Sequence, residues 1–392
     1  MLKIHDFDSF ASHRTPFYWY DMELLERTLS LVGELSRRYD VRVHYAVKAN
    51  IERRIMEKIS SSGFGADCVS GWEVAHAAEC GFPMAETVFS GVGKTDAEIV
   101  QALSLGVGCI NCESLQEIEV VSGIAASMGV TAHVSLRINP NIDAHTHRYV
   151  TTGLYENKFG IGENDFGRAM EVLGKAPSLS FHGLHFHIGS QITDVKEVFS
   201  EEAEKALEVV ELFESQGFKV DNINLGGGLG VDYENPDEHP VADFEEWFKA
   251  VASIPHGRER RLHVEPGRSL VAQCGTLVSR VVFVKPGQTR NFLILDAGMN
   301  DLVRPALYGA YHKIENLTAI HVRNDKVTDS VYDVVGPVCE SSDVFGSSRE
   351  LRRSFRGDLI AIRTAGAYGS VMSSRYNMRP FAGAAFSDEE VL

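Results

Sequence analysis

The stretch VHYAVKA (43–49), followed by ERRIMEKISS (52–61), sets the pattern from which the fold is inferred. The first run has the β-branched and aromatic residues of a strand, and the second has the apolar spacing of an amphipathic helix. Further strand-like runs alternate with helical patterns at 65–70, 87–92, 108–113, 131–139, 179–189, 222–228 and 261–267. Eight such units predict a closed, TIM-like (β/α)8 barrel, with an open doubly wound sheet as the alternative.

The segments that flank the predicted barrel have a different pattern. From about residue 273 onward, strand-like runs follow one another with few helical patterns, at 276–285, 291–298, 319–324, 331–339 and 358–364. This is typical of an antiparallel β-domain. The run TPFYWYD (15–21) is also strand-like and precedes a helical pattern for which Asp21 is a candidate N-cap. We therefore expect two domains, a barrel of 25–268 and a β-domain of 1–24 and 269–392 joined by the N-terminal strand.

Composition narrows the classes of protein. Hydrophobic residues make up 44% and charged residues 23% of the 392 residues, as in ordinary globular proteins. The formal net charge of −16 argues against nucleic acid as a partner, because phosphate backbones are bound by clustered Lys and Arg. The chain has no apolar run of roughly 18 residues and no signal-peptide pattern, so it is expected to be cytoplasmic, with no membrane contact.

The long loop 140–162, with His145 and His147 as a candidate lid, is expected to be functional.

Polar residues gather where the predicted barrel strands end. Barrel enzymes build their sites from these C-terminal ends. The residues are Lys48, Asp67, Arg137, His187, Gly226, Gly227, Gly228, Glu265 and Arg268. Closure brings strand eight beside strand one, so Glu265 should lie near Lys48. Taken singly, Lys48 could be a strand lysine paired with an acid, the glycines a turn, and Glu265 with Arg268 an ion pair.

Together these residues predict a site for pyridoxal 5'-phosphate. That cofactor needs an amine, an acid at its pyridine nitrogen and donors for its phosphate. Lys48 would hold it as a Schiff base, Glu265 would face the nitrogen, and His187 would lie against the ring. The glycines and Arg268 would bind the phosphate.

Two other motifs are weaker. The stretch 90–95, SGVGKT, resembles the end of a phosphate-binding P-loop, but Val88 stands where the first glycine is required. His185 and His187 are spaced like metal ligands of barrel hydrolases, but the later strand ends supply no further His or Asp. We therefore predict no metal. The single CxxC at 109–112 lacks the second pair that a zinc site needs.

Five motifs carry a family resemblance: YAVKAN (45–50), HFHIGSQ (185–191), NLGGGLG (224–230), EPGRSL (265–270) and CESSD (339–343). In this order they resemble the alanine-racemase-like, fold type III decarboxylases that depend on pyridoxal phosphate. The resemblance runs from about residue 15 to about residue 380. Within that group, 139–162 and 296–316 resemble the enzymes that decarboxylate meso-2,6-diaminopimelate at its D-centre to L-lysine and carbon dioxide, the last step of lysine biosynthesis.

The resemblance also implies roles for individual residues. Lys48 and Cys339 would be catalytic. Cofactor-binding residues would include Ser190, Gly267, Arg268 and Tyr368, and substrate-binding residues would be Arg268, Arg304, Tyr308, Glu340 and Tyr368. In the family, the cysteine and glutamate of the CESSD motif reach into the partner subunit's site, so a homodimer with shared active sites is expected. Ser342 departs from the more usual CESGD.

Other functions remain open on the sequence. The enzyme could decarboxylate ornithine, arginine or a carboxynorspermidine-type substrate, or could be a racemase with a tyrosine from the β-domain as second base. A non-catalytic cofactor-binding protein is a further alternative, although such proteins tend to be a barrel alone. Arg304 favours a diamino diacid, because one carboxylate must be held while the other leaves, and guanidinium binds carboxylate bidentately.

Overall fold

The computed structural model describes residues 7, 10, 12–140, 142, 158–257, 260–323 and 329–389. The chain forms two compact units. The barrel unit comprises Leu29–Gly230 and Asp243–Gly267, and the β-unit comprises Met1–Thr28, Val231–Ala242 and Arg268–Leu392. The expected domain bounds placed 231–242 in the barrel, whereas the structure groups it with the β-unit. The reason is that Asp237 of this segment forms ion pairs with Arg363 and Lys313 of the β-unit.

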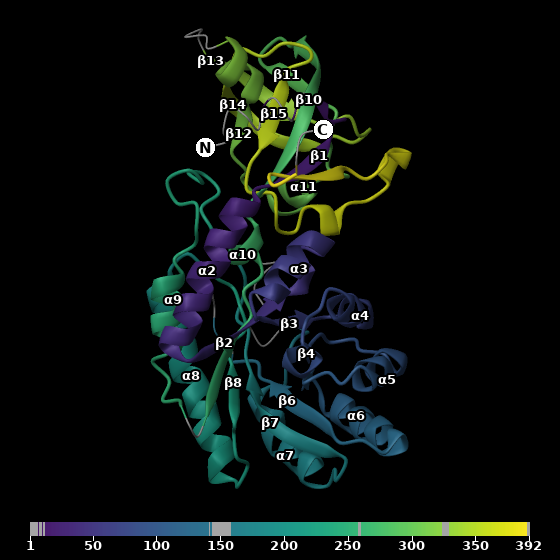
Figure 1. Ribbon diagram of the computed structural model, residues 1–392, viewed down its shortest axis with the longest axis vertical. Helices are drawn as coiled ribbons and strands as arrows, with labels where there is room; N and C mark the ends of the chain where they lie inside the picture. Colours follow the sequence, from purple (N-terminus) through teal and green to yellow (C-terminus); the bar gives the residue numbers. More distant parts are fainter. Residues whose placement is uncertain are drawn as a thin grey trace. The chain divides into compact units, whose positions relative to one another are not determined.

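The barrel unit is a closed ring of eight parallel strands in chain order, so the predicted (β/α)8 fold is confirmed. Figure 1 shows helices of this unit on the outside of its strands. The last strand pairs with the first, with Val43 opposite Val264. The strands are β2 (Val41–Ala46), β3 (Gly65–Cys68), β4 (Thr87–Phe89), β5 (Cys109–Cys112), β6 (Ala132–Arg137), β7 (Leu179–His185), β8 (Asn222–Asn224) and β9 (Arg261–Val264). Most are shorter than expected. Strand β2 ends at Ala46, and Lys48 lies in the 3-10 turn η1 (Val47–Ala49) that follows it.

Helices connect the barrel strands, and α4, α5, α6, α8 and α9 begin at side-chain caps. Ser70 accepts a hydrogen bond from the Glu73 backbone N–H, and Thr95 forms a capping box with Glu98. Each cap satisfies an N–H group that has no partner inside the helix. The helices are α3 (Arg53–Ser61), α4 (Gly71–Glu79), α5 (Asp96–Ser104), α6 (Leu115–Met128), α7 (Phe166–Gly174), α8 (Val195–Ser215) and α9 (Phe244–Val251).

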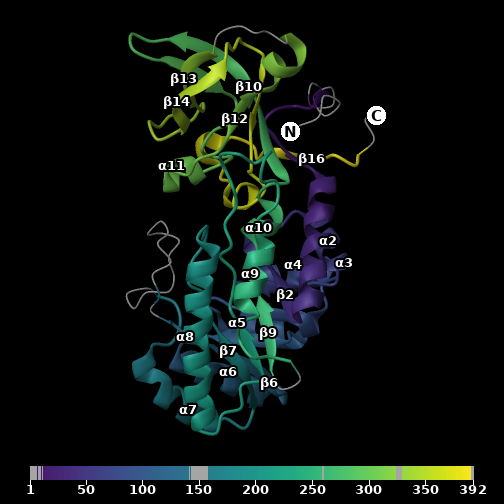
Figure 2. The same ribbon diagram turned by 90° about the vertical axis from the view of Figure 1, so that its left-hand side faces the viewer.

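The β-unit contains a mostly antiparallel sheet whose longest path is β12-β15-β10-β11-β13-β14. Figure 2 labels β10, β12, β13 and β14 of this sheet. The predicted N-terminal strand is confirmed, because β1 pairs antiparallel with β10. Two strand pairs are parallel, β1 with β16 and β11 with β13. The strands are β1 (Phe17–Tyr20), β10 (Gly275–Pro286), β11 (Asn291–Leu295), β12 (Ile314–Asn316), β13 (Asp329–Val335), β14 (Val344–Arg352), β15 (Leu359–Ile362) and β16 (Gly383–Phe386).

Three further helices matter for the site and its scaffold: the long α2 (Met22–Tyr39) and the short α10 (Arg268–Val271) and α11 (Arg304–Tyr308). Helix α2 starts as predicted, since the Leu24 N–H donates to Asp21 Oδ1 at 2.9 Å. No helix among the described residues is long and apolar enough to cross a membrane. The cytoplasmic location stays a prediction.

One expected strand is wrong. Ala319–Arg323, inside the predicted strand 319–324, forms a π-helical turn. Its first N–H donates to Asn316 Oδ1 at 2.9 Å, and Arg323 at its end pairs with Asp358 at 2.7 Å. These two side-chain contacts fix a turn where the β-branched residues suggested an extended segment. Most of the predicted functional loop 140–162, including His145 and His147, lies outside the described residues.

Candidate active site

In the barrel unit, Lys48 lies beside an acid. Its Nζ is 3.8 Å from Asp67 Oδ2. The pairing of β2 with β3 sets this contact, because Ala46 is in register with Asp67 at the two strand ends. Burial raises the pKa of the Asp67 carboxyl, and the nearby charge of Glu265 raises it further, although Lys48 opposes both effects. Two carboxylates therefore share the charge of one lysine at this end of the barrel.

Glu265 follows β9 and is held on both oxygens. Its Oε1 accepts from Asn224 Nδ2 at 2.6 Å, and its Oε2 accepts from His185 Nε2 at 3.0 Å. Burial by itself would raise the pKa of this carboxyl, but the attraction and hydrogen bond of His185, together with Lys48, hold the pKa below its ordinary value. Glu265 is therefore an ionised carboxylate inside the barrel. The Ala46 N–H donates to Pro266 O at 3.2 Å, so the ends of β2 and β9 are adjacent.

Backbone surrounds the loop after β8 so closely that side chains there have no room. Gly226 and Gly228 have φ of +66° and +114°, a region that L side chains rarely adopt. A Cβ on Gly227 would collide with the carbonyl oxygen of Glu265. The Gly227 N–H donates to His187 Nδ1 at 3.2 Å, and burial keeps the pKa of His187 well below its ordinary value, so this imidazole is a neutral acceptor.

The barrel residues fit pyridoxal phosphate on three counts. They offer an amine on Lys48, an ionised acid on Glu265, and a side-chain-free backbone at Gly226–Gly228. The buried Oδ1 of Asp67 has no hydrogen-bond partner among the described residues. Two acids beside one lysine favour binding a group that carries a positive charge, as a protonated pyridine nitrogen does.

In the β-unit, Arg268 and Arg304 form a second cluster around Tyr233. Arg268 Nη1 donates to the Tyr233 hydroxyl at 2.7 Å, and its guanidinium lies 4.9 Å from the centre of the Tyr368 ring. Arg304 lies 4.7 Å from the centre of the Tyr233 ring. Tyr233 therefore contacts both guanidinium groups, one through its hydroxyl and one through its ring face.

Arg304, the first residue of α11, is a buried cation for which the described residues provide no anion. It is 5% exposed, and its Nη1 donates to His312 Nε2 at 2.8 Å. No carboxylate lies within 4.0 Å of it in the described part of the chain. Burial lowers the pKa of this guanidinium. Buried charges are usually paired, so a buried guanidinium with no carboxylate beside it in the described residues favours an anionic ligand.

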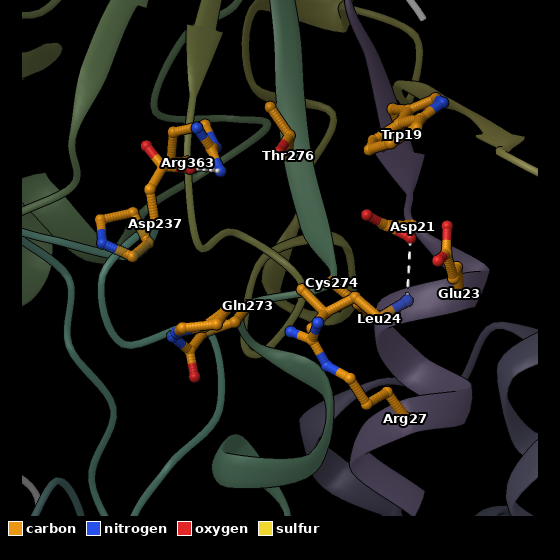
Figure 3. Close-up of a pocket in the computed structure, with 12 residues that line it drawn as sticks. Trp19, Asp21, Glu23, Leu24, Arg27, Asp237, Gln273, Cys274, Thr276 and Arg363 are labelled. Atoms are coloured by element: carbon orange, nitrogen blue, oxygen red, sulfur yellow. Dashed lines mark hydrogen bonds and ion pairs between the residues drawn. The ribbon is translucent and has the colours of Figure 1, made fainter. Parts of the chain in front are cut away.

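Figure 3 shows a cavity of about 230 Å³ within the β-unit. Asp237 and Arg363 face each other on its wall and form an ion pair at 3.1 Å. None of the predicted site residues lines it. Its relevance is structural, because this ion pair fastens the segment that also carries Tyr233.

Cys339 and Glu340 are exposed residues of the β-unit. The Cys339 N–H donates to Asn377 Oδ1 at 2.9 Å. The Ser342 hydroxyl donates to Glu340 Oε1 at 2.8 Å and, with a bond from Tyr376, lowers the pKa of the glutamate. Ser342, the departure from CESGD, thus orients Glu340 through a hydroxyl that glycine lacks. Tyr308 is the last residue of α11.

Sequence reasoning missed four residues that shape these clusters: Asn224, His185, Tyr233 and His312. His185 was noticed only for its spacing from His187, which resembles a metal pattern rejected for lack of further ligands, and Asn224 only as the first residue of the motif NLGGGLG. Lys94 of the P-loop-like stretch is structural. It is buried and donates to Gly91 O, Asn111 O and Glu117 Oε1.

The comparisons with known proteins agree with this fold. Residues 23–272 match the family described as pyridoxal-dependent decarboxylase, pyridoxal binding domain. The chain belongs to the pyridoxal-dependent decarboxylases, as its barrel and lysine–glycine–glutamate arrangement indicate. It is 47% identical to a diaminopimelate decarboxylase of Bacteroides thetaiotaomicron over 100% of both chains. It is 43% identical to one of Neisseria meningitidis, over 93% of this chain and 87% of that one.

A solved structure gives the same result. The crystal structure of diaminopimelate decarboxylase from Helicobacter pylori, complexed with L-lysine, matches with a TM-score of 0.90 and 38% identity. The match covers 98% of this chain and 94% of that chain. Within the pyridoxal-dependent decarboxylases, the chain therefore belongs to the diaminopimelate decarboxylase family.

Proposed function

We propose that this protein decarboxylates meso-2,6-diaminopimelate at its D-centre and releases L-lysine, with pyridoxal 5'-phosphate as its cofactor. One observation carries the choice of substrate within the family: Arg304 is a buried guanidinium with no carboxylate partner in the described residues. A substrate with a second carboxylate at its non-reacting end supplies that partner. Ornithine and arginine lose their only carboxylate in the reaction and leave nothing for Arg304 to hold.

The barrel residues would hold the cofactor. Lys48 would bind its aldehyde, Glu265 its pyridine nitrogen, and Gly226–Gly228 with Ser190 and Gly267 its phosphate. Pyridoxal phosphate, when bound, supplies an electron sink for the electron pair left behind as carbon dioxide departs. Glu265, held ionised by Asn224 and His185, would keep a proton on the nitrogen that faces it. Asp67 would balance the charge of Lys48 whenever the lysine is a protonated ammonium that is not bonded to the cofactor.

The β-unit residues would select and protonate the substrate. Arg304 would bind the carboxylate of the L-centre, with Arg268, Tyr308 and Tyr368 as further contacts. Glu340, whose pKa is lowered by the Ser342 hydroxyl and by Tyr376, would bind the distal ammonium as a carboxylate. Cys339 would give its thiol proton to the carbon that lost carbon dioxide. The exposure of Cys339 and Glu340 supports the family expectation of a homodimer in which they serve the partner's site.

A panel assay tests the substrate directly. Purified enzyme with added pyridoxal phosphate is given meso-diaminopimelate, its LL isomer, ornithine, arginine and lysine, and carbon dioxide release is measured. We expect release from the meso isomer alone. Release from ornithine or arginine without release from the meso isomer would overturn the assignment, and racemisation without carbon dioxide would indicate the racemase.

A further inference from the structure

His312 is a fully buried histidine to which the roles above give no part, and its protonation state follows from its neighbours. Its Nε2 lies 2.8 Å from Arg304 Nη1, and its Nδ1 lies 2.8 Å from the carbonyl oxygen of Arg363. A guanidinium can only donate and a carbonyl oxygen can only accept. The proton therefore sits on Nδ1, and Nε2 offers a lone pair. His312 is the neutral imidazole in one defined tautomer.

The surroundings keep His312 neutral. Burial lowers the pKa of its imidazole to about 3, with the charge of Arg304 as the next contribution. Protonation would turn Nε2 into a donor facing another donor. At neutral pH, the His312 imidazole therefore accepts a hydrogen bond from Arg304 while it carries no charge itself.

Tyr233 completes this neutral support. Its ring lies under the Arg304 guanidinium, and its edge packs against the His312 ring with centroids 5.1 Å apart at 78°. The Tyr233 hydroxyl is held by Arg268 at 2.7 Å. Two uncharged rings thus fix the guanidinium from one edge and one face.

A second buried arginine of the same unit shows how an arginine is held when its charge is balanced inside the fold. Arg363 is 8% exposed, but its guanidinium pairs with Glu315 at 2.7 Å and with Asp237 at 3.1 Å. Its charge is compensated inside the fold, as expected of a structural arginine. Arg304 is as well buried, yet none of the described residues places a carboxylate against its charge. The difference lies in what holds it.

We propose that His312 is a positioning residue, which orients Arg304 without neutralising it and so leaves the guanidinium available to the carboxylate of the substrate's non-reacting end. This inference rests on the function proposed above. Its consequence is that the charge at position 312 matters more than its shape. A carboxylate at position 312 would form an ion pair with the Arg304 guanidinium and so compete with the substrate carboxylate.

The matched pair His312→Gln and His312→Glu separates charge from shape. Both side chains place an oxygen acceptor near the position of Nε2, and both lose the bond to the Arg363 carbonyl. In the holoenzyme, we expect His312→Gln to raise the KM for meso-diaminopimelate by at most roughly threefold, and His312→Glu to raise it by roughly thirtyfold or more. The kcat at saturating substrate should change much less than KM in both variants.

Ligand binding gives a readout that needs no turnover. L-lysine retains the carboxylate that Arg304 would hold, whereas 1,5-diaminopentane has no carboxylate. Calorimetry on the holoenzyme should show that His312→Glu lowers the affinity for L-lysine by roughly the factor by which it raises KM. The affinity for diaminopentane should stay within about twofold of the parent value. Equal L-lysine affinity in the Gln and Glu variants would overturn the proposal, as would equal weakening of both ligands.

A double-mutant cycle tests whether His312 acts through Arg304, and it also serves if His312→Glu does not fold. In an Arg304→Met background, His312→Leu, which removes the acceptor and should weaken L-lysine binding in the parent enzyme, should no longer change L-lysine affinity, because the group that His312 positions is gone. Additive effects would contradict the inference. If the parent enzyme binds L-lysine through this pair but releases no carbon dioxide from meso-diaminopimelate, the proposed function fails and the positioning role stands.

Discussion

Replacing Arg304 by methionine should separate substrate binding from stability, because the arginine is buried but breaks no ion pair when removed. Loss of one partner from a buried ion pair commonly costs about 3–5 kcal/mol. Here the loss is one hydrogen bond, which leaves His312 Nε2 without a donor at a cost of about 1–3 kcal/mol. Methionine also removes the desolvation penalty of a buried ion, which offsets this cost. The free energy of unfolding should therefore fall by less than about 3 kcal/mol.

Binding should respond in the opposite way. A carboxylate held by guanidinium forms charge-assisted hydrogen bonds worth about 1.5–3 kcal/mol. The KM for meso-diaminopimelate should therefore rise by roughly 10- to 150-fold, measured as carbon dioxide release at varied substrate concentration.

Arg363→Met is the matched control, since this buried arginine pairs with Glu315 and Asp237. It should lower the free energy of unfolding in urea by about 3–5 kcal/mol and leave KM nearly unchanged. The reasoning is refuted if Arg304→Met destabilises the fold as much as Arg363→Met does while its KM stays at the parent value.

The remaining predictions concern the cofactor, the pH response and the dimer. Lys48→Ala should abolish the visible absorbance of bound pyridoxal phosphate, and a variant that keeps that absorbance would remove the basis of the cofactor assignment. Glu265→Gln should retain the cofactor but lower kcat by roughly 100-fold or more, since a neutral amide does not favour a protonated pyridine nitrogen. Burial lowers the pKa of His312 from an ordinary 6.5 to about 3. Between these two pH values, His312 is protonated in the unfolded chain but not in the folded chain. Stability should then fall as the pH falls below 6.5, by about 1.4 kcal/mol per pH unit from this group. His312→Gln should remove that share of the slope in urea unfolding between pH 7 and 5, and parallel slopes would contradict it. Mixing Lys48→Ala and Cys339→Ala proteins should restore some activity if subunits share sites; mixtures that exchange subunits without recovery would argue against sharing.

The sequence by itself determined the barrel and one half of the site. All eight barrel strands could be predicted because period-2 and period-3.6 patterns are local properties of the chain. Once the barrel is assumed closed, the first and last strands must be neighbours, which the pairing of β2 with β9 bears out. That closure is what allowed Lys48 and Glu265 to be expected together.

Local sequence patterns gave a wrong prediction where side-chain contacts from elsewhere in the chain favoured another structure. The run 319–324 has the composition of a strand, yet side-chain bonds from Asn316 and to Asp358 hold 319–323 as a helical turn. Such contacts depend on residues brought together by the fold, which propensity cannot register. The segment 231–242 likewise joins the β-unit through the ion pairs of Asp237.

Only the tertiary structure decided how Arg304 is held. The sequence identified the arginine through its resemblance to the family, but Tyr233 and His312 carried no signal of their own. Tyr233 is far from Arg304 in the chain, and their contact arises from folding alone. Whether an arginine is structural or available to a ligand depends on the charge of its neighbours. Those neighbours cannot be identified from the order of residues along the chain, because only the folded structure decides which side chains come into contact.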